Sequence, residues 1–337
     1  MISNIAYIES PLQAFNLVEY LDTNNLVLDL LIINKRTEIS PQNYEQISYL
    51  LNFINYKSLM TIDVEVRLGK LLSISRSLIS VSKFINFSDS VKLISGEYRS
   101  RIFWMLTSKF SKRDVILLDD GTATLRIQRS GKITARSFIK NVFYKIFGLV
   151  NNEREKITFF SVYDIEDNVS KYDKVIRHHY QSYKLKLQGL PQELNKVFII
   201  GSPLYEAGVT VVDDIQLTLK MINKIKKDRK GSELVYIPHR RERDEKINAL
   251  KDNVNICRLS YPFELYPLVA GENVVSVAGF YSSLYDNLIN IYDDKVKITA
   301  YVLDDGIITP KWIDFVKSVY ENYRKYDNKN IALTHLN

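Results

Sequence analysis

Two carboxylates end a predicted strand in the first half of the chain. Residues 115–118 are apolar and largely branched, and Asp119, Asp120 and Gly121 follow directly. Such a strand places its terminal acids at the carboxyl edge of a parallel sheet, where a carboxylate can accept a proton from an attacking hydroxyl group. Gly121 allows a sharp turn. The alternative is an ordinary strand-end turn, because Asp-Gly is common turn chemistry and the motif returns at 302–306.

A histidine beside two arginines follows another predicted strand, within 235–242. His239 could donate a hydrogen bond or a proton to a leaving phosphate, and Arg240 could bind its oxygens. The alternative is a solvated run of charges that opens a surface helix. Of the four histidines, only His239 stands at a strand tip before Arg-Arg. The pair at 178–179 has no carboxylate or cysteine at ligand spacing, so we interpret it as structural.

A third motif runs from a strand through Gly279 to Ser282 and Ser283, which open a helix. Free backbone N–H groups, the positive end of the helix dipole and two hydroxyls would together bind an anion. A plain N-cap serine is the alternative. Glu264 opens an earlier helix, where it could hold ribose hydroxyls or simply favour the helix N-terminus.

Alternating strands and helices must position these side chains. The chain of 337 residues fits two domains. Helical patterns cover 215–225 and 284–291. Short branched runs predict buried strands at 27–33, 115–118, 157–162, 234–237, 274–277 and 296–302. This alternation favours parallel sheets with helices on both faces.

A coarse duplication indicates where the two domains meet. The apolar runs 5–8 and 197–200 each lead into a Ser-Pro-Leu segment. In the first copy Ser10 is a natural N-cap, and Pro11 suits the first helical position. Gly and Pro interrupt the pattern at 188–191, so we expect domains at 1–190 and 191–337. Two doubly wound domains facing each other would form a cleft at the carboxyl ends of both sheets.

Composition narrows the classes of function. Lys and Arg number 46 against 39 Asp and Glu, a formal charge of +7 that favours an anionic partner. The single cysteine, Cys257, excludes a disulfide framework and a cysteine-built metal site. Neither a secretory signal nor a membrane span is predicted, so we expect a cytoplasmic protein. Dinucleotide, P-loop, zinc-protease and serine-hydrolase motifs are missing from the sequence.

Taken in order, the motifs resemble those of bacterial sialyltransferases, most of all glycosyltransferase family 52, with kinship to the bacterial polysialyltransferases. The resemblance rests on short segments between residue 9 and about residue 290: 9–13, 119–121, 237–242, 263–264 and 282–283. One departure is that Arg240 follows His239, where the family commonly has proline. The resemblance implies a GT-B fold: two Rossmann-like doubly wound domains with the active site in the cleft between them.

The resemblance also implies an activity. This is inverting, metal-independent transfer of sialic acid from CMP-sialic acid to a galactose-type hydroxyl of a bacterial surface glycan, lipopolysaccharide or capsule. Asp119 or Asp120 would be the base, with Asp213 and Asp214 in reserve, and His239 would assist departure of the phosphate. The donor would be bound by Arg240, Glu264, Gly279, Ser282 and Ser283, and the acceptor side would include Glu9, Ser10 and Gln13. No metal or other cofactor is expected, because His239 and helix-end N–H groups would neutralise the phosphate.

Residues 132–150 predict a basic amphipathic helix. One face would carry Phe138, Ile139, Val142, Phe143, Ile146 and Phe147, whereas Arg136, Lys140 and Lys145 lie largely off it. Such a helix can lie on an anionic bilayer; alternatively, its apolar face packs on the sheet. The implied acceptor is built on a lipid carrier, so we expect peripheral contact with the cytoplasmic face of the inner membrane. An oligomer is compatible with the sequence.

Two other functions compete with sialyl transfer. The first is a GT-B glycosyltransferase that uses another donor, such as a UDP-hexose. The second is a basic protein without enzyme activity that binds nucleic acid or a membrane; nucleic-acid binding is suggested by the +7 charge and 22 tyrosines. The basic residues are dispersed among the acids and no nucleic-acid motif is found, so we expect no nucleic-acid partner.

Overall fold

The chain divides into a first unit, Met1–Ser182, and a second unit, Tyr183–Asn337. The computed structural model describes residues 2–37, 42–64, 74, 77–129, 138–139, 142, 148–150, 152–325 and 330–336. The division falls before the 190/191 boundary expected from the sequence. Helix α6 (Gln181–Leu187) spans it, and the glycine that suggested the later boundary, Gly189, follows that helix with a φ of 84°.

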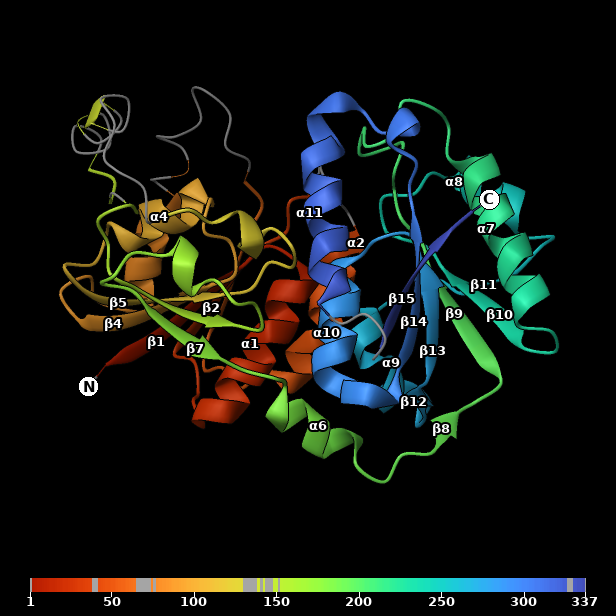
Figure 1. Cartoon of the computed structure of the whole chain (residues 1–337). Coiled ribbons are helices and arrows are strands. Elements are labelled where there is room, and N and C mark those ends of the chain that lie inside the picture. The colour runs from red at the N-terminus through yellow and green to blue at the C-terminus, as the bar shows by residue number, and fades with distance from the viewer. Residues whose placement is uncertain are drawn as a thin grey trace. The chain divides into compact units, whose positions relative to one another are not determined.

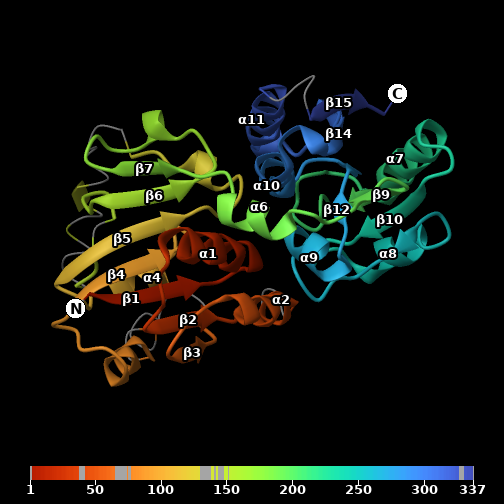
Figure 2. The ribbon, with the colours of Figure 1, turned by 90° about the horizontal axis from the view of Figure 1, so that it is seen from below.

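In its described part, the first unit is built on a sheet of seven parallel strands in the order β3-β2-β1-β4-β5-β6-β7 (Figure 2). The strands are β1 (Ser3–Ile8), β2 (Leu30–Asn34), β3 (Leu59–Ile62), β4 (Ser90–Ser95), β5 (Lys112–Leu118), β6 (Ile157–Ser161) and β7 (Lys174–Arg177). The order reverses between β1 and β4. This is the switch point of a doubly wound sheet, where such folds bind ligands at the carboxyl ends of the strands.

The helices of the first unit flank this sheet. Helices α1 (Pro11–Asn24) and α2 (Gln42–Leu50) lie on one face and α4 (Arg101–Thr107) on the other (Figure 2). The N-terminus of α1 is as predicted: the Ser10 Oγ accepts the Gln13 N–H at 3.3 Å, and Pro11 occupies the first turn. Single turns of 3-10 helix occur at Leu51–Phe53, Ser80–Lys83, Thr124–Arg126 and Glu166–Asn168.

The second unit repeats the design with six parallel strands, in the order β11-β10-β9-β13-β14-β15 among its described residues. These are β9 (Lys196–Ile200), β10 (Glu233–Ile237), β11 (Asn255–Ile256), β13 (Ser276–Gly279), β14 (Lys297–Val302) and β15 (Ile331–His335). Two further short strands, β8 (Gln192–Glu193) and β12 (Asn273–Val274), pair with each other. The order again reverses, here between β9 and β13.

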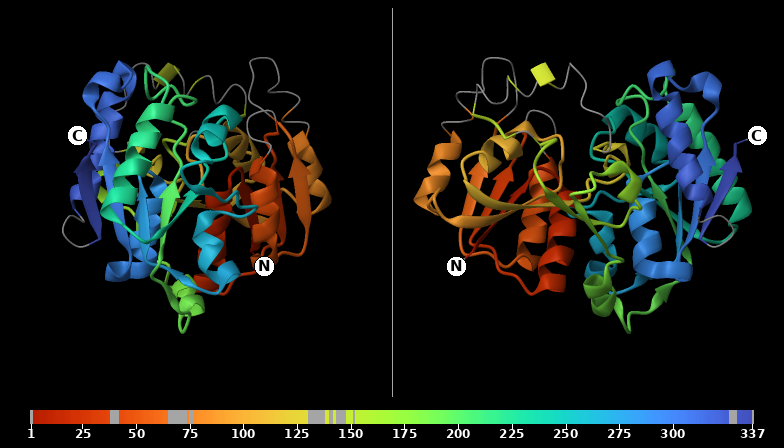
Figure 3. Two further views of the ribbon diagram at one scale, coloured as in Figure 1. Left: turned by 90° about the vertical axis from the view of Figure 1, so that its right-hand side faces the viewer. Right: turned by 60° about the vertical axis from the view of Figure 1, so that its left-hand side comes forward.

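Helices cover both faces of the second sheet. Helices α7 (Ile215–Asp228) and α8 (Asp244–Leu250) lie on one face, and α10 (Ser283–Tyr292) and α11 (Ile313–Arg324) on the other (Figure 1). In the left view of Figure 3, α7 stands in front of the sheet. Helix α9 (Tyr266–Ala270) precedes β12, and 3-10 turns occur at Phe263–Leu265, Asp293–Lys295, Asp305–Ile307 and Pro310–Trp312.

Two doubly wound parallel sheets confirm the α/β architecture predicted from the sequence, with local differences. The predicted strand 274–277 is divided, because β12 ends at Val274 and β13 begins at Ser276. The second Ser-Pro-Leu segment forms a turn, in which the Leu204 N–H bonds to the Ser202 carbonyl at 2.9 Å, and the helix begins only at Ile215. No helix in the described part is both long enough and apolar enough to cross a bilayer.

Substitution of two phenylalanines in the first unit should lower the free energy of unfolding by very different amounts. The ring of Phe159 on β6 is 1% exposed, whereas that of Phe84 is 45% exposed. Phe159→Ala should lower the free energy of unfolding by about 3–5 kcal/mol, because it removes a buried ring and leaves a cavity. Phe84→Ala should cost about 1 kcal/mol or less. Urea denaturation followed by circular dichroism measures both; equal losses would contradict the assigned core.

Candidate active site

Three acidic residues meet at the carboxyl edge of the first sheet. Glu9 follows β1, Glu97 comes two residues after β4, and Asp120 comes two residues after β5. Strands β1 and β5 both pair with β4, so the three strand ends are neighbours at the switch point. Glu9 and Asp120 were predicted as site residues from the sequence, whereas Glu97 was not.

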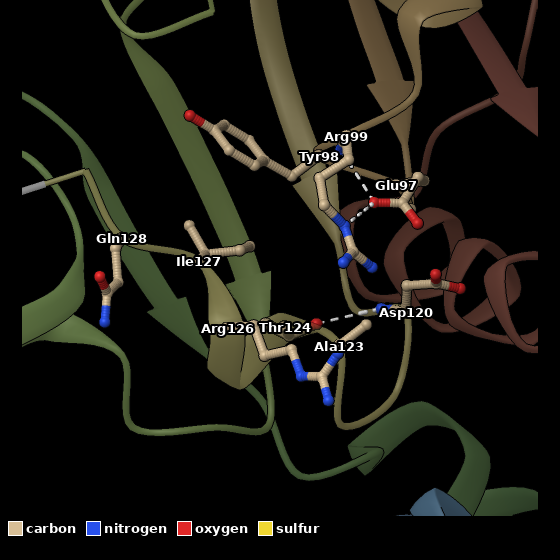
Figure 4. A pocket seen from close by; sticks show the side chains of 10 residues that line it. Glu97, Tyr98, Arg99, Asp120, Ala123, Thr124, Arg126, Ile127 and Gln128 are labelled. Atoms are coloured by element: carbon tan, nitrogen blue, oxygen red, sulfur yellow. Dashed lines mark hydrogen bonds and ion pairs between the residues drawn. The ribbon is translucent and has the colours of Figure 1, made fainter. Parts of the chain in front are cut away.

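Asp120 is held by the residues expected on the acceptor side. Its Oδ1 accepts a hydrogen bond from the Gln13 Nε2 at 3.0 Å and a longer one from the Ser10 Oγ at 3.4 Å. Its backbone N–H donates to the Thr124 Oγ1 at 3.1 Å (Figure 4). The structure thus brings Ser10 and Gln13 directly to the carboxylate.

Glu9 stabilises the position of Gln13. Its carboxylate is buried and accepts hydrogen bonds from the Tyr7 hydroxyl at 2.5 Å, the Ser100 hydroxyl at 2.6 Å and Arg36 at 3.0 Å. Its backbone N–H donates to the Gln13 Oε1 at 2.8 Å, which leaves the Gln13 amide nitrogen turned toward Asp120. Glu9 therefore orients Gln13.

Asp119 is the more enclosed of the two neighbouring aspartates. It is 1% exposed, and its oxygens accept hydrogen bonds from the Ser161 Oγ at 2.6 Å and the Val162 N–H at 2.7 Å. Burial raises the pKa of Asp119 to about 6, although these hydrogen bonds oppose the rise. The carboxylate thus joins the end of β5 to the end of β6, which is a structural use of both oxygens.

His178 packs beside Asp119 as a structural residue. Its ring stacks on Phe160 with centroids 4.0 Å apart, and its Nε2 lies 3.9 Å from the Asp119 carboxylate. Burial, with the nearby charges of His179 and Arg177, lowers the pKa of His178 to about 3. The imidazole is therefore neutral at neutral pH.

A pocket of about 160 Å³ opens beside Asp120 (Figure 4). It is lined by Gly96, Glu97, Tyr98, Arg99, Asp120, Ala123, Thr124, Arg126, Ile127 and Gln128. Gly96 is needed here because a Cβ would lie 2.3 Å from the Gln13 Cγ, so only glycine lets the end of β4 approach α1 so closely. Burial raises the pKa of Asp120 to about 7, and the negative charge of Glu97 adds to this effect.

The expected donor-binding residues of the second unit also gather at one sheet edge. His239 and Arg240 follow β10, whereas Gly279 ends β13 and precedes Ser282. Strands β10 and β13 both pair with β9, so these strand ends flank the switch point of the second sheet.

His239 is half-buried and has a defined proton position. Its Nδ1 accepts the Arg241 N–H at 3.1 Å, so a neutral ring carries its proton on Nε2. Burial, followed by the positive charges of Arg240 and Arg241, lowers the pKa of His239 to about 3. At neutral pH His239 is therefore an uncharged donor of one hydrogen bond through Nε2.

A buried ionic cluster fixes the loop that carries His239. The Lys246 Nζ lies 2.6 Å from Glu242, 2.7 Å from Asp214 and 2.9 Å from the Ser202 carbonyl oxygen. Glu242 in turn accepts the His239 N–H at 2.8 Å. A Cβ on Gly201 would lie 2.2 Å from Glu242, so glycine is required for this close packing.

A solvated run of charges was the alternative interpretation of the segment after His239, and it is wrong for Lys246, which is 0% exposed. The i, i+4 spacing of Glu242 and Lys246 was the available signal for this cluster. Of the reserve bases, Asp214 is fully buried in the cluster, and Asp213 is exposed and pairs with Arg243.

Helix α10 begins at the same edge. The Ser282 Oγ accepts the Leu284 N–H at 3.2 Å, so this hydroxyl is an N-cap, and Ser283 is the first residue of the helix. Gly279 is required because a Cβ would lie 2.4 Å from the Tyr285 hydroxyl and 2.8 Å from the Ile200 carbonyl oxygen. The two serines therefore place a capped helix N-terminus at the switch point.

Glu264 reaches the same region from the turn before α9. Its Oε1 accepts the Asn287 side-chain N–H of α10 at 2.8 Å, and it is 7% exposed. Burial raises the pKa of Glu264, whereas its hydrogen bonds and the nearby charge of Arg240 lower it. Glu264 thus contacts α10 through Asn287 and is close enough to Arg240 to feel its positive charge.

Two other sequence motifs have different outcomes. At the second Asp-Asp-Gly, Asp304 is exposed and its carboxylate accepts the Gly306 N–H at 2.8 Å, an ordinary turn.

Most of the amphipathic segment 132–150 lies outside the described residues. Of its apolar face, Phe138, Ile139 and Val142 are described, and they are 60%, 70% and 44% exposed. Among the residues described, no group of three or more potential ligands could hold a metal ion.

The buried cluster of the second unit predicts a large effect for one lysine. Lys246→Met should destabilise the protein by about 3–5 kcal/mol, because Asp214 and Glu242 would remain buried without their cation. The matched control is Arg258→Met, which removes a half-exposed partner of Asp244 and should cost about 0–1 kcal/mol. Urea denaturation at pH 7 measures both variants. A loss at Lys246 no larger than at Arg258 would show that the cluster is not needed for stability.

No protein-family model matches the sequence, and no curated protein matches it. Solved structures do match across both units. The MnaA–UDP structure from S. aureus is 10% identical, with 97% of this chain and 88% of that chain covered and a TM-score of 0.51. The UDP-N-acetylglucosamine 2-epimerase from Rickettsia bellii is 10% identical, with coverage of 95% and 88% and a TM-score of 0.50.

The calicheamicin glycosyltransferase CalG4 is 7% identical to the chain, with 99% of this chain and 86% of that chain covered and a TM-score of 0.50. Identities this low show the fold alone. Together with the two doubly wound sheets, the matches confirm the fold expected from the sequence: the chain has the GT-B fold, with two Rossmann-like domains.

Proposed function

We propose that this protein is a glycosyltransferase that moves sialic acid from CMP-sialic acid to a galactose-type hydroxyl of a bacterial surface glycan. The reaction would invert the anomeric centre and need no metal. The observation that carries the proposal is Asp120, a carboxyl group with a pKa of about 7 that lines a pocket at the switch point of the first sheet. The choice of donor rests on the motifs in the sequence.

Asp120 suits the role of base better than Asp119. The oxygens of Asp119 are both bonded within the protein, whereas Asp120 lines the pocket. A pKa near the working pH gives a useful fraction of carboxylate together with a stronger proton affinity than an ordinary aspartate has. The pocket is smaller than the roughly 300–1,000 Å³ of sites for drug-sized ligands, which suits a single acceptor sugar ring.

The carboxyl edge of the second sheet suits the nucleotide. The Nε2–H of His239 would donate to the phosphate, and the N-terminus of α10 adds the positive end of a helix dipole. Arg240 would contribute its positive charge, and Glu264 could accept hydrogen bonds from ribose hydroxyls. These groups would stabilise the charge that develops on the departing phosphate.

The proposed step balances as a single displacement. The acceptor oxygen forms a bond to the anomeric carbon of the sialic acid while its proton passes to Asp120. The bond from the anomeric carbon to the phosphate oxygen breaks, and CMP leaves with the electron pair. The hydrogen bond from His239 strengthens as that oxygen gains charge.

A UDP-sugar enzyme of the same fold is the second candidate. Two of the structures with a TM-score of at least 0.50 name UDP or a UDP-sugar in their titles. One of these is named as an epimerase and another neighbour as a glycosyltransferase, so the fold serves more than one reaction. The nucleotide that binds therefore separates the candidates.

A nucleotide screen tests the donor. We expect CMP to raise the melting temperature more than UDP or GDP does, because a ligand at 100 times its Kd stabilises the native state by about 2.7 kcal/mol. His239→Ala should reduce the shift, since it removes a donor to the phosphate. Differential scanning fluorimetry provides the measurement. A larger shift with UDP would favour the second candidate, and no shift with any nucleotide would reject both.

The base assignment predicts a separation of binding from chemistry. Asp120→Asn should lower the rate of transfer from CMP-sialic acid by at least about 100-fold, because the amide cannot accept the proton. The CMP-induced melting shift should remain, since Asp120 belongs to the first unit. Asp304→Asn, in the exposed copy of the motif, is the control and should retain full activity. Equal rates in the two variants would exclude Asp120 as the base.

A further inference from the structure

Glu97 and Asp120 are two carboxyl groups in one pocket. They follow the adjacent strands β4 and β5, in which Ser95 pairs with Leu117. Figure 4 shows their carboxylates on the same side of the pocket. Burial and then the negative charge of Glu97 raise the pKa of Asp120. Two carboxyl groups that line one pocket repel each other when both are ionised, so the pair favours a state that holds one proton.

The surroundings of Asp120 favour retention of that proton. The two described side chains that donate hydrogen bonds to its carboxylate, Gln13 and Ser10, are both neutral. The charged groups around it, from each neighbouring strand end and from its own loop, are Glu9 with Arg36, Glu97 with Arg99, Asp119 and Arg126. Burial and the two glutamates raise the pKa of Asp120 to about 7.

Glu97 is itself held in place. Its Oε1 accepts the backbone N–H of Arg99 at 2.8 Å and the Arg99 Nε–H at 3.2 Å. The first contact makes a tight turn after β4, and the second fixes the direction of the carboxylate. The position of Glu97 therefore depends on Arg99 and does not require a bound ligand.

We propose that Glu97 is a positioning residue that shares one proton with Asp120, so that Asp120 becomes a proton acceptor only after the pair has released this proton. Proton sharing is a property of the free protein, whereas its use in transfer rests on the proposed function. The pair makes Asp120 a stronger base than an isolated aspartate, because the proton it gains is held by two carboxyl groups.

The pH dependence follows from the sign of the shift. Asp120 is protonated below its raised pKa, so transfer should increase as the pH rises through about 7. Glu97→Gln removes the negative neighbour and should lower the pKa of Asp120 by about one unit or more. The acid limb of the rate profile should move to lower pH by the same amount.

Carboxyl NMR of the free protein tests the pair directly. Protein labelled with ¹³C at aspartate and glutamate carboxyls is titrated from pH 4 to 9, and Asp120 is assigned from the signal lost in Asp120→Asn. We expect the Asp120 signal to titrate near pH 7 in the wild type and at least about one unit lower in Glu97→Gln. Glu97→Asp, which keeps the charge, should stay closer to the wild type, and Asp89→Asn, an exposed site in the same unit, should leave the Asp120 signal unchanged.

Each outcome has one meaning. An Asp120 titration that is the same in wild type and Glu97→Gln overturns the proposal, whatever the activity. If Glu97→Gln fails to fold, an Asp120 titration at an ordinary aspartate value in the wild type overturns it equally. If the Asp120 titration differs between the wild type and Glu97→Gln but the protein transfers no sialic acid, the shared proton is supported and the proposed function is rejected. A shifted titration with a matching shift in the rate profile supports both.

Discussion

The parallel direction of neighbouring strands is the constraint on which both candidate sites depend. Parallel strands end at the same edge of a sheet, and a reversal of strand order leaves that edge accessible between two strands. In the first unit this brings Glu9, Glu97 and Asp120 together from three separate segments. In the second unit it brings His239 and Ser282 to the two sides of β9. The chemistry of each edge therefore follows from topology.

Buried polar contacts hold these edges in place. Asp119 ties β5 to β6 through Ser161, and Lys246 ties the loops after β9 and β10 through Glu242. A buried charge is costly unless it is paired, so these groups tolerate little movement. The groups proposed for chemistry, Asp120 and His239, lie beside these rigid anchors, which is how a loop residue can be positioned as firmly as one on a strand.

Much of the architecture could be predicted from the sequence, because the cap of α1 and the branched strands are local signals. Contacts between residues on neighbouring strands could not be predicted in this way, because they depend on the order of the strands in the sheet. The two Asp-Asp-Gly segments have the same local sequence pattern, yet Asp120 lies beside Gln13 in the pocket and Asp304 is exposed. Strand β4 was missed because serine and lysine interrupt its apolar residues, and Glu97 was missed with it. Lys246 has the sequence pattern of a surface charge, and only packing shows that it is buried.

Amide hydrogen exchange with and without CMP tests most directly whether the switch point of the second sheet is the nucleotide site. We expect slower exchange at 239–241 and 282–285 when CMP is bound, and no change at 304–306, which are exposed in the turn after β14. Bound CMP that leaves 239–241 and 282–285 unchanged, with protection only in other segments, would contradict the account.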